Sequence, residues 1–260
     1  MASSDHQIPF HDKRAIDLWF AVMKWFKPDM VDYLGDVSDQ VCFAKFSEGK
    51  TDEFLNQMAK NKPEDLFPYV QEQERPVAEF YEQTRKMLPR AQLFSALGNH
   101  DVRVFEYIDK KLPSIKDQVT ANALWRLDDL GYDYIYYGDL PKLRFGNVYG
   151  HHGISAKTGS GLSVKSDMEN LDISLIRGHS HRCAAVYKTY ELTNRTLVGY
   201  EIGHMSDLKS TGMSYTNIRD WQQAFMIGHI IDNVPHLQII SIIEDEHGKS
   251  CVVDGKYFSA

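Results

Sequence analysis

The chain has 260 residues, enough for one large domain that buries a substantial core. Hydrophobic residues make up 43% of it and charged residues 25%, as in ordinary soluble globular proteins. The formal net charge of −7 argues against a protein that binds nucleic acid non-specifically, because such proteins usually have a net positive charge. An acidic chain can still act on nucleic acid, since bound divalent metals reverse the sign of the charge locally.

The cysteines and the N-terminal residues predict a cellular compartment. Cys42, Cys183 and Cys251 are odd in number and far apart, which predicts reduced thiols rather than a disulfide framework. The first residues contain no basic region followed by an apolar stretch, so we expect no secretory signal. Apolar runs such as 224–227 are too short to span a bilayer. We therefore expect a cytoplasmic location and no membrane partner.

Helices and strands alternate in the first half of the chain. The predicted elements are a helix over 12–27, a strand over 29–34, a mostly helical segment over 46–90, a strand over 92–97 and a helix over 102–111. Pro63, Pro68 and Pro76 are expected to break the segment 46–90 into pieces. We interpret this segment as a helical insert within a single domain that covers residues 1–260.

Strands dominate the second half. They are predicted over 132–137, 143–149, 172–177, 184–190, 197–202, 225–231 and 237–243. A turn at Asn233-Val234-Pro235 is predicted to join the last two. Alternating helices and strands followed by strands favour an α/β architecture, in which ligands gather at the carboxyl ends of strands.

Five short polar motifs follow these strands, or lie where a strand is expected, in one fixed order. They are Asp5-His6-Gln7, Gly35-Asp36-Val37-Ser38-Asp39, Gly98-Asn99-His100-Asp101, His151-His152-Gly153 and Gly178-His179-Ser180-His181. Together they supply the carboxylates, imidazoles and amide oxygen that can hold two metal ions side by side. A centre with two metals is suited to splitting phosphate esters.

Each motif also has a purely structural interpretation. Asp5-His6-Gln7 could be a polar N-terminal tail, Asp36 a turn-forming aspartate, and Gly98-Asn99-His100-Asp101 an Asx-type turn before a helix. In the metal-binding interpretation, His100 stands beside the metals with its ring positioned by Asp101, and is suited to protonating a leaving oxygen. His152 is preferred to His151 as the ligand in its motif.

The motifs between Asp5 and His181 resemble those of the calcineurin-like metallophosphoesterases. The later residues Asn194-Arg195 and Trp221-Gln222-Gln223-Ala224-Phe225 resemble those of small phage and bacterial members. The family pattern is D-x-H, G-D-x-x-D, G-N-H-D/E, H-G and G-H-x-H. The resemblance implies a sandwich of two mixed β-sheets flanked by helices, with the site at the carboxyl ends of strands. It implies that the first metal is bound by Asp5, Gln7, Asp36 and His181, and the second by Asp36 as a bridge, Asn99, His152 and His179.

The same resemblance implies a mechanism, with His100 as general acid steered by Asp101. A water or hydroxide held between the metals attacks phosphorus in line, while the metals stabilise the charge that develops on the phosphoryl oxygens. Candidates for substrate binding are Arg103, Arg182, His151 and His204. Both arginines could equally be ordinary surface residues.

The sequence departs from the family pattern in two places. Gln7 stands where the family has histidine, and its weaker amide donor favours Mn²⁺ or Mg²⁺ over Zn²⁺ at the first position. We therefore expect two divalent ions, with Mn²⁺ ahead of Mg²⁺, Ni²⁺, Zn²⁺ or Fe. The second departure is Ala2-Ser3-Ser4, which cannot supply the apolar first strand that the family buries before this aspartate.

The expected substrate is a phosphodiester in a nucleotide or nucleic acid. Protein Ser/Thr phosphatases of the superfamily carry an arginine after the second motif and another before Gly-Asn-His, where this chain has Gln40 and Ala96-Leu97. The insert and the loop 205–220 could form a rim that selects the substrate. A phosphomonoesterase is the alternative among enzymes. A metal-binding or partner-binding module with lost catalysis is the alternative from a different class.

Overall fold

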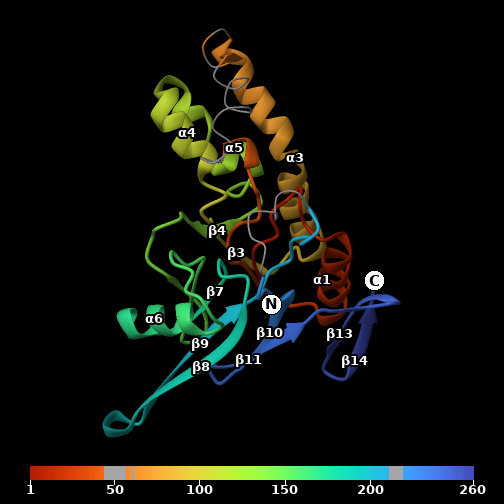
Figure 1. Cartoon of the computed structure of the whole chain (residues 1–260), viewed down its shortest axis with the longest axis vertical. Helices are drawn as coiled ribbons and strands as arrows, with labels where there is room; N and C mark the ends of the chain where they lie inside the picture. The colour runs from red at the N-terminus through yellow and green to blue at the C-terminus, as the bar shows by residue number, and fades with distance from the viewer. Residues whose placement is uncertain (44–56, 59, 61, 211–218) are drawn as a thin grey trace.

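Two mixed β-sheets lie face to face, and helices cover their outer faces (Figure 1). The computed structural model describes residues 1–43, 57–58, 60, 62–210 and 219–260. The predicted sandwich of two mixed sheets flanked by helices is therefore confirmed. The predictions for 46–56, 59 and 61 in the insert, and for 211–218 in the loop 205–220, lie outside the described residues.

The larger sheet has six strands in the order β11-β10-β1-β2-β3-β4. Its strands are β1 (Ala2–Ser3), β2 (Met30–Tyr33), β3 (Gln92–Ala96), β4 (Tyr132–Ile135), β10 (Ala224–Ile231) and β11 (Val234–Ser241). The strands β1 to β4 are parallel, whereas β10 pairs antiparallel with both β1 and β11. The carboxyl ends of β1, β2 and β3 therefore lie at the same edge.

The second sheet has five strands in the order β5-β6-β7-β9-β8. Its strands are β5 (Lys142–Phe145), β6 (Val148–His151), β7 (Ser174–Arg177), β8 (Cys183–Tyr190) and β9 (Arg195–Ile202). The middle strands β6, β7 and β9 are parallel, and the edge strands are antiparallel to their neighbours. A small third sheet contains β12 (Ile243–Asp245), β13 (Gly248–Val253) and β14 (Lys256–Ser259).

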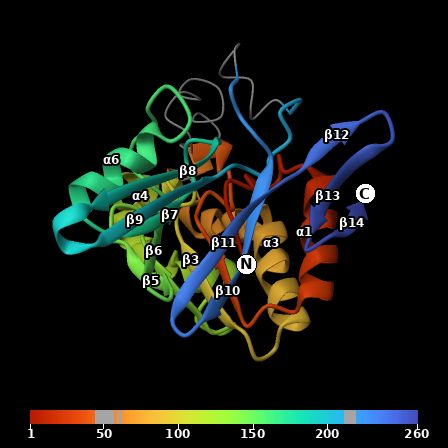
Figure 2. The same ribbon diagram turned by 90° about the horizontal axis from the view of Figure 1, so that it is seen from below.

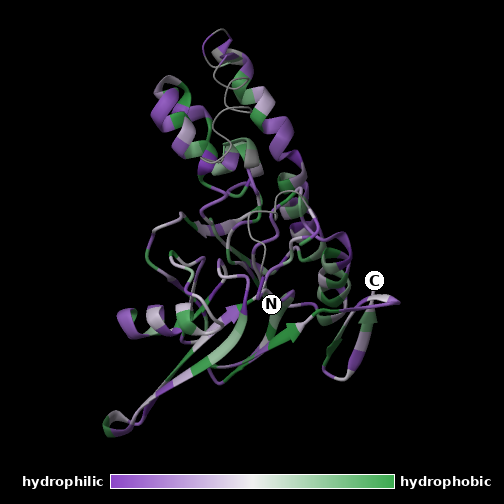
Figure 3. Cartoon of the chain, viewed as in Figure 1, coloured by the Kyte–Doolittle hydropathy of each residue, from purple (hydrophilic) through white to green (hydrophobic). Residues whose placement is uncertain are grey.

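Helices cover both outer faces of the sandwich (Figure 2). They are α1 (Lys13–Phe26), α3 (Pro63–Met87), α4 (Arg103–Lys111), α5 (Ala121–Trp125) and α6 (Leu162–Leu171), with 3₁₀ turns at Val41–Phe43, Pro113–Gln118 and Glu191–Thr193. Buried side chains of the first four helices belong to one hydrophobic cluster with the six-stranded sheet, in which α5 packs against α3. Helix α6 packs on the five-stranded sheet. Hydrophobic and hydrophilic residues alternate around α3 and α4 in Figure 3, as expected of helices with one buried face.

The core has three layers that follow from this arrangement. Trp19, Tyr33 and Tyr81 are fully buried between the helices and the six-stranded sheet. The layer between the sheets contains apolar side chains from both, among them Leu34, Val148, Ile176 and Met226. A third layer, with Val164 and Met168, lies under α6. Alternate residues of a strand point to opposite faces, which is why both faces of the sheets are apolar.

The two-residue strand β1 corrects the expectation that the chain lacks a buried first strand. Ala2 and Ser3 are fully buried and pair with β2 on one side and β10 on the other. The space here is too narrow for large apolar side chains: a Cβ on Gly178 would lie 1.7 Å from Ser4 Oγ. The single hydroxyl proton of Ser4 has two acceptors within reach, since Ser4 Oγ lies 2.6 Å from Asp5 Oδ2 and 3.0 Å from the Leu34 carbonyl oxygen.

Three further sequence predictions are wrong in detail. Pro68 and Pro76 lie inside the continuous helix α3, because its buried apolar face outweighs the hydrogen bonds that prolines remove. Residues 143–149 form a hairpin of β5 and β6 rather than one strand, with Gly146 at φ +58° in its turn. The turn before β11 is at Asp232 and Asn233, both with positive φ. Pro235 instead lies within β11, an edge strand that tolerates a missing N–H.

The other predicted elements match the observed ones, whereas α5, α6 and β12 to β14 were not predicted. Cys42, Cys183 and Cys251 are free thiols. Among the described helices, none combines the length and the apolar character needed to cross a membrane.

Candidate metal centre

The five motifs meet where the carboxyl ends of the parallel strands from both sheets come together. Asp5, Asp36 and Asn99 follow β1, β2 and β3, whereas His152 and His179 follow β6 and β7. Parallel pairing continues beyond β1 and β2, because Asp5 N donates to the Gly35 carbonyl at 2.9 Å and Gln7 N donates to the Asp36 carbonyl at 2.8 Å. Segments far apart in the sequence are thus fixed side by side.

The backbone at this edge is strained. The residues Asp5, Gln7, Asp36, His179 and His181 all have φ between 51° and 68°. This left-handed region is unfavourable for residues other than glycine, and its use clusters at functional sites. Gly98 allows a close approach of two loops, since a Cβ there would lie 2.1 Å from Asp36 Oδ1. These conformations turn the side chains toward a common point.

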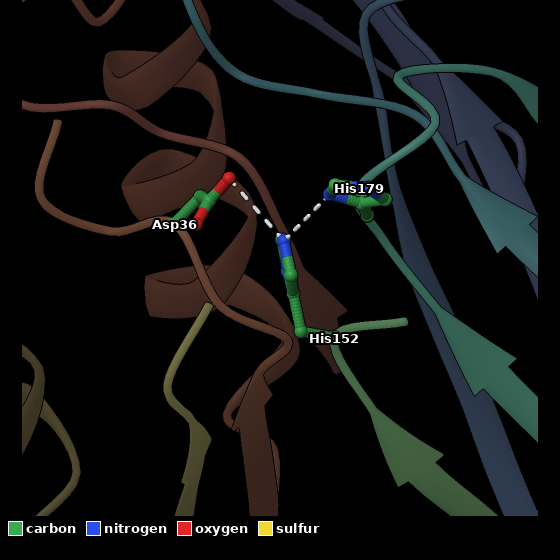
Figure 4. Close-up of side chains that lie close together, drawn as sticks. All are labelled: Asp36, His152 and His179. Atoms are coloured by element: carbon green, nitrogen blue, oxygen red, sulfur yellow. Dashed lines mark hydrogen bonds and ion pairs between the residues drawn. The ribbon is translucent and has the colours of Figure 1, made fainter. Parts of the chain in front are cut away.

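The second metal position is built around His152. Its Nδ1 donates to the Leu34 carbonyl at 2.7 Å, so Nε2 is the ring nitrogen that faces the site. Around Nε2 lie Asp36 Oδ2 at 3.2 Å and His179 Nδ1 at 3.2 Å (Figure 4). Asn99 Oδ1 lies 3.1 Å from the same nitrogen. Ligand atoms of Asp36, His152 and His179 all lie within 4.8 Å of one another. This donor set fits a divalent cation.

The charges around the second metal position would stabilise a bound cation. Burial lowers the pKa of His152, but the Asp36 carboxylate outweighs burial and raises that pKa to about 9. Burial alone would raise the pKa of Asp36, yet the His152 and His100 rings hold it far below its usual range. The pKa of His179 is lowered to about 3 by burial and by the charge of His152. A cation bound among these atoms would satisfy the carboxylate as the His152 proton does.

The first metal position contains Asp5, Gln7 and His181. Asp5 Oδ1 lies 3.0 Å from His181 Nε2, and the Gln7 Nε2 atom lies 3.4 Å from the same nitrogen. Gln7 Oε1 is buried and has no hydrogen-bond partner among the described residues. A buried carbonyl oxygen without a partner costs free energy, and rotation of the amide would direct it to the site. The residues therefore fit a cation here, with one neutral oxygen donor.

His100 is oriented by Asp39 rather than by Asp101, which corrects the sequence-based assignment. His100 Nδ1 lies 3.0 Å from Asp39 Oδ2, and Arg103 Nη1 donates to the Asp39 carbonyl at 2.7 Å. Asp101 instead accepts hydrogen bonds from Gly98 N and Ser38 N, both at 2.7 Å, and so joins two of the loops. Asp39 was visible in the sequence as the last residue of the second motif.

The carboxylates around His100 favour the protonated form of its ring. Burial lowers the pKa of His100, but the Asp36 and Asp39 carboxylates outweigh that effect and raise it. His100 Nε2 lies 3.9 Å from Asp36 Oδ2, so the ring reaches the edge of the metal centre. A protonated imidazole beside a metal centre can donate a proton to a leaving oxygen.

The four residues suggested for substrate binding are placed differently from one another. Arg103 packs against Asp39, and Arg182 lies next to His181 with Nε 3.5 Å from Asp220 Oδ2. His151 turns toward α6, with Nε2 3.5 Å from Asp167 Oδ2. His204 is fully buried against the His181 ring, with centroids 5.3 Å apart. The arginines thus lie closer to solvent than the histidines do.

Comparisons with known proteins place the chain among distant relatives. No family model matches the sequence. A "Gene 54 protein" of Mycobacterium phage D29 is 24% identical over 253 residues, covering 92% of both chains. A protein of the same name from Mycobacterium phage L5 is 24% identical over 230 residues, covering 86% of both.

Two structures of Vps29 are among the solved structures that this chain matches. Vps29 of Entamoeba histolytica in complex with zinc gives a TM-score of 0.43 at 13% identity, over 100% of this chain and 95% of that one. Vps29 of Chaetomium thermophilum gives a TM-score of 0.46 at 13% identity, over 99% of this chain and 93% of that one. The phage relatives are consistent with the predicted likeness to small phage members of the metallophosphoesterases.

Proposed function

We propose that this chain is a calcineurin-like metallophosphoesterase that binds two divalent metal ions and hydrolyses phosphodiester bonds in nucleotides or nucleic acid. One observation carries the proposal. The acceptor atoms of Asp36, Asn99 and His179 converge within 3.2 Å of His152 Nε2, whose ring is fixed from behind by a backbone carbonyl. Such a cluster of acceptors, with the His100 imidazole beside it, is suited to phosphoryl chemistry.

The residues divide the work as follows. Asp5, Gln7, His181 and Asp36 would hold one ion, and Asp36, Asn99, His152 and His179 the other. Bound ions lower the pKa of a coordinated water and neutralise charge on the phosphoryl oxygens. We favour Mn²⁺ for both positions, because oxygen donors from Gln7 and Asn99 suit hard cations better than Zn²⁺.

His100 would supply the proton for the leaving oxygen. Its Nδ1 is engaged by Asp39, which leaves Nε2 directed at the Asp36 side of the centre. Arg103 holds Asp39 from the other side through its carbonyl, so the ring cannot easily turn away. In this scheme Asp39 is a positioning residue and His100 the catalytic acid.

A diester substrate is favoured over a phosphoprotein. Gln40 occupies the place of a phosphate-binding arginine, and its Oε1 accepts a hydrogen bond from Val104 N at 2.8 Å, so it supports α4 instead. Because the relatives are phage proteins, we extend the proposal to a soluble enzyme acting in the cytoplasm of the infected host. A phosphomonoesterase remains the second candidate, favoured only if monoesters alone are cleaved.

Metal-dependent turnover tests the proposal. The protein is stripped with a chelator and supplied with Mn²⁺, Mg²⁺, Ni²⁺ or Zn²⁺ one at a time, and hydrolysis of bis-p-nitrophenyl phosphate is compared with that of p-nitrophenyl phosphate. We expect Mn²⁺-dependent cleavage of the diester that is lost in His100→Asn and Asp36→Asn. His229→Asn and Asp254→Asn serve as matched controls, since this exposed pair lies 3.8 Å apart on β10 and the β13–β14 turn.

The outcomes separate the candidate functions. Cleavage of the monoester alone would replace the phosphodiesterase with the phosphomonoesterase. A folded, metal-loaded protein that turns over neither substrate would contradict the enzyme proposal and favour a binding module.

A further inference from the structure

An aromatic side chain lies directly against the first metal position. The Trp221 ring meets the His181 ring edge to face, with centroids 4.5 Å apart, and lies 6.2 Å from the His204 ring. Trp221 is half-buried. Trp19 and Trp125, by contrast, are fully buried in the core. Trp221 is therefore the tryptophan placed beside the proposed chemistry.

The segment that carries Trp221 is fastened to the metal centre. Gln222 N donates to the His181 carbonyl at 2.9 Å, and Gln222 Oε1 accepts from Cys183 N at 3.0 Å. His204 N in turn donates to the Gln222 carbonyl at 3.1 Å. These bonds on both sides of the segment hold the indole at a fixed position relative to His181. A rigid aromatic surface loses little conformational entropy when a ligand stacks on it.

Two arginines and one aspartate lie near this aromatic side chain, with Arg182 Nε 3.5 Å from Asp220 Oδ2. The Arg219 guanidinium lies 5.9 Å from the centroid of the Trp221 ring, and Arg182 follows His181 in the chain. Arginine beside an exposed aromatic ring is typical of sites that bind nucleotides, because the base stacks and the phosphate is attracted. The chain as a whole is acidic, with a net charge of −7, so this local concentration of arginines stands out.

Trp221 and the general acid lie at opposite ends of the centre. Trp221 contacts His181 at the first metal position, whereas His100 approaches Asp36 on the side of His152. The leaving group departs where the proton is supplied. A group near Trp221 is consequently the one that stays on the phosphate.

We propose that Trp221 is a stacking surface for the nucleobase on the retained side of the scissile phosphate, with Arg182 and Arg219 attracting the phosphate. This inference rests on the proposed phosphodiesterase function and names its substrate class as nucleoside phosphodiesters. Every base offers a π-face, so stacking on Trp221 would select nucleosides over simple alkyl diesters without strict base preference.

Two substrates with the same leaving group test the proposal. Thymidine 5′-p-nitrophenyl phosphate and methyl p-nitrophenyl phosphate both release p-nitrophenolate, and only the first carries a base on the retained side. We expect wild-type kcat/KM to favour the thymidine ester by more than about tenfold, as one stacked base allows. Trp221→Leu should lower that ratio at least about fivefold, whereas Trp221→Phe, which keeps a ring, should preserve most of it. The ratio of the two kcat/KM values does not depend on how much of the protein is folded or metal-loaded, because such losses lower both values by the same factor.

A matched control and a binding measurement complete the test. Trp25→Leu removes a tryptophan that packs on Phe258, with centroids 5.5 Å apart, and should leave both kcat/KM values unchanged. Calorimetry on the Mn²⁺-loaded protein compares thymidine monophosphate with inorganic phosphate. We expect the nucleotide to bind at least about tenfold more tightly, and Trp221→Leu to abolish the advantage.

The outcomes distinguish this inference from the proposed function. Cleavage of both esters with a ratio near one, or a ratio unchanged by Trp221→Leu, would overturn the stacking surface and leave the phosphodiesterase intact. No turnover of either ester, together with a nucleotide advantage that depends on Trp221, would overturn hydrolysis and support base binding.

Discussion

The two metal positions are built from the same edge of the sandwich but differ in their donor sets. At the second position, His152 Nε2 has three acceptor atoms within 3.2 Å, and its ring is fixed by the Leu34 carbonyl. At the first position, Asp5 and His181 lie 3.0 Å apart, while the Gln7 carbonyl oxygen is buried without a partner among the described residues. The donor set of the second position is therefore complete, whereas the first position has the neutral amide of Gln7 in place of a stronger ligand.

This difference has a functional meaning. A site with a neutral amide in place of an imidazole holds its ion more weakly and discriminates less in favour of Zn²⁺. The second ion would then be resident, whereas the first would exchange with the metal supply. In the proposed scheme Asp36 would ligate both ions and so would link the occupancy of one position to that of the other.

The substitution Asp36→Asn should have the largest effect, because it removes the carboxylate that both positions share. We expect loss of both ions and a fall in kcat of at least about a thousandfold. Metal content by mass spectrometry and turnover of bis-p-nitrophenyl phosphate measure the two effects, with Asp254→Asn as control. Retention of two ions would show that Asp36 does not bridge them.

The substitutions His152→Asn and His181→Asn should separate the two positions. Each removes one imidazole, so each should release one ion and lower kcat/KM by about a hundredfold or more. We expect the ion that survives in His181→Asn to bind more tightly than the one that survives in His152→Asn, and calorimetry with Mn²⁺ measures both. Equal affinities would contradict the proposed inequality.

Replacing Asp39 by Asn should alter the pH dependence of catalysis. The Asp36 and Asp39 carboxylates raise the pKa of His100, so loss of the Asp39 charge lowers that pKa and less of the general acid is protonated at a given pH. The alkaline limb of the kcat profile should therefore move to lower pH, and kcat at neutral pH should fall by about ten- to a hundredfold.

The comparison variant for that experiment is Asp101→Asn. Asp101 accepts hydrogen bonds from two backbone N–H groups, one of which an amide could not satisfy. Thermal unfolding of Asp101→Asn should show a loss of stability of about 1–3 kcal/mol. The alkaline limb of its kcat profile should stay at the same pH as in the wild type. If the alkaline limb of the kcat profile shifted in Asp101→Asn and not in Asp39→Asn, Asp101 rather than Asp39 would be the residue that positions His100.

The substitution Gln7→His should have the smallest effect on rate. It tests most directly whether the two metal positions differ because of their donor sets. An imidazole at this position completes a stronger donor set, so Zn²⁺ should bind the first position about ten- to a hundredfold more tightly. Competition calorimetry between Zn²⁺ and Mn²⁺ measures the change. If Zn²⁺ affinity did not rise, the side chain at position 7 would not face an ion.

Several features of the molecule could be predicted from the sequence because they depend on local patterns. Apolar spacing predicts α1, and Asp12 accepts a hydrogen bond from Ala15 N at its start. The strands before Asp36, Asn99 and His179 are short apolar runs followed by glycine, which is a local signal as well. Since parallel strands align their carboxyl ends, these patterns also indicate that the motif residues meet.

Other features depended on contacts between distant segments. The small residues of β1 become a central strand only because Gly178 and Leu34 leave a narrow, hydrogen-bonding space around Ser4. The prolines of α3 are tolerated because Leu66, Val70, Val77 and Tyr81 bury one face of the helix on the core. In both cases tertiary packing outweighs a local preference, which no short window of sequence contains.

The sequence by itself determined which residues could bind metals and the order in which the strands deliver them, since residue chemistry and strand periodicity are local properties. Only the tertiary structure decided that Asp39, not Asp101, faces His100, and that Trp221 lies on His181, about 40 residues away. Orientation and cross-chain proximity arise when separate segments pack against one another, and they are fixed by the shape of the whole core.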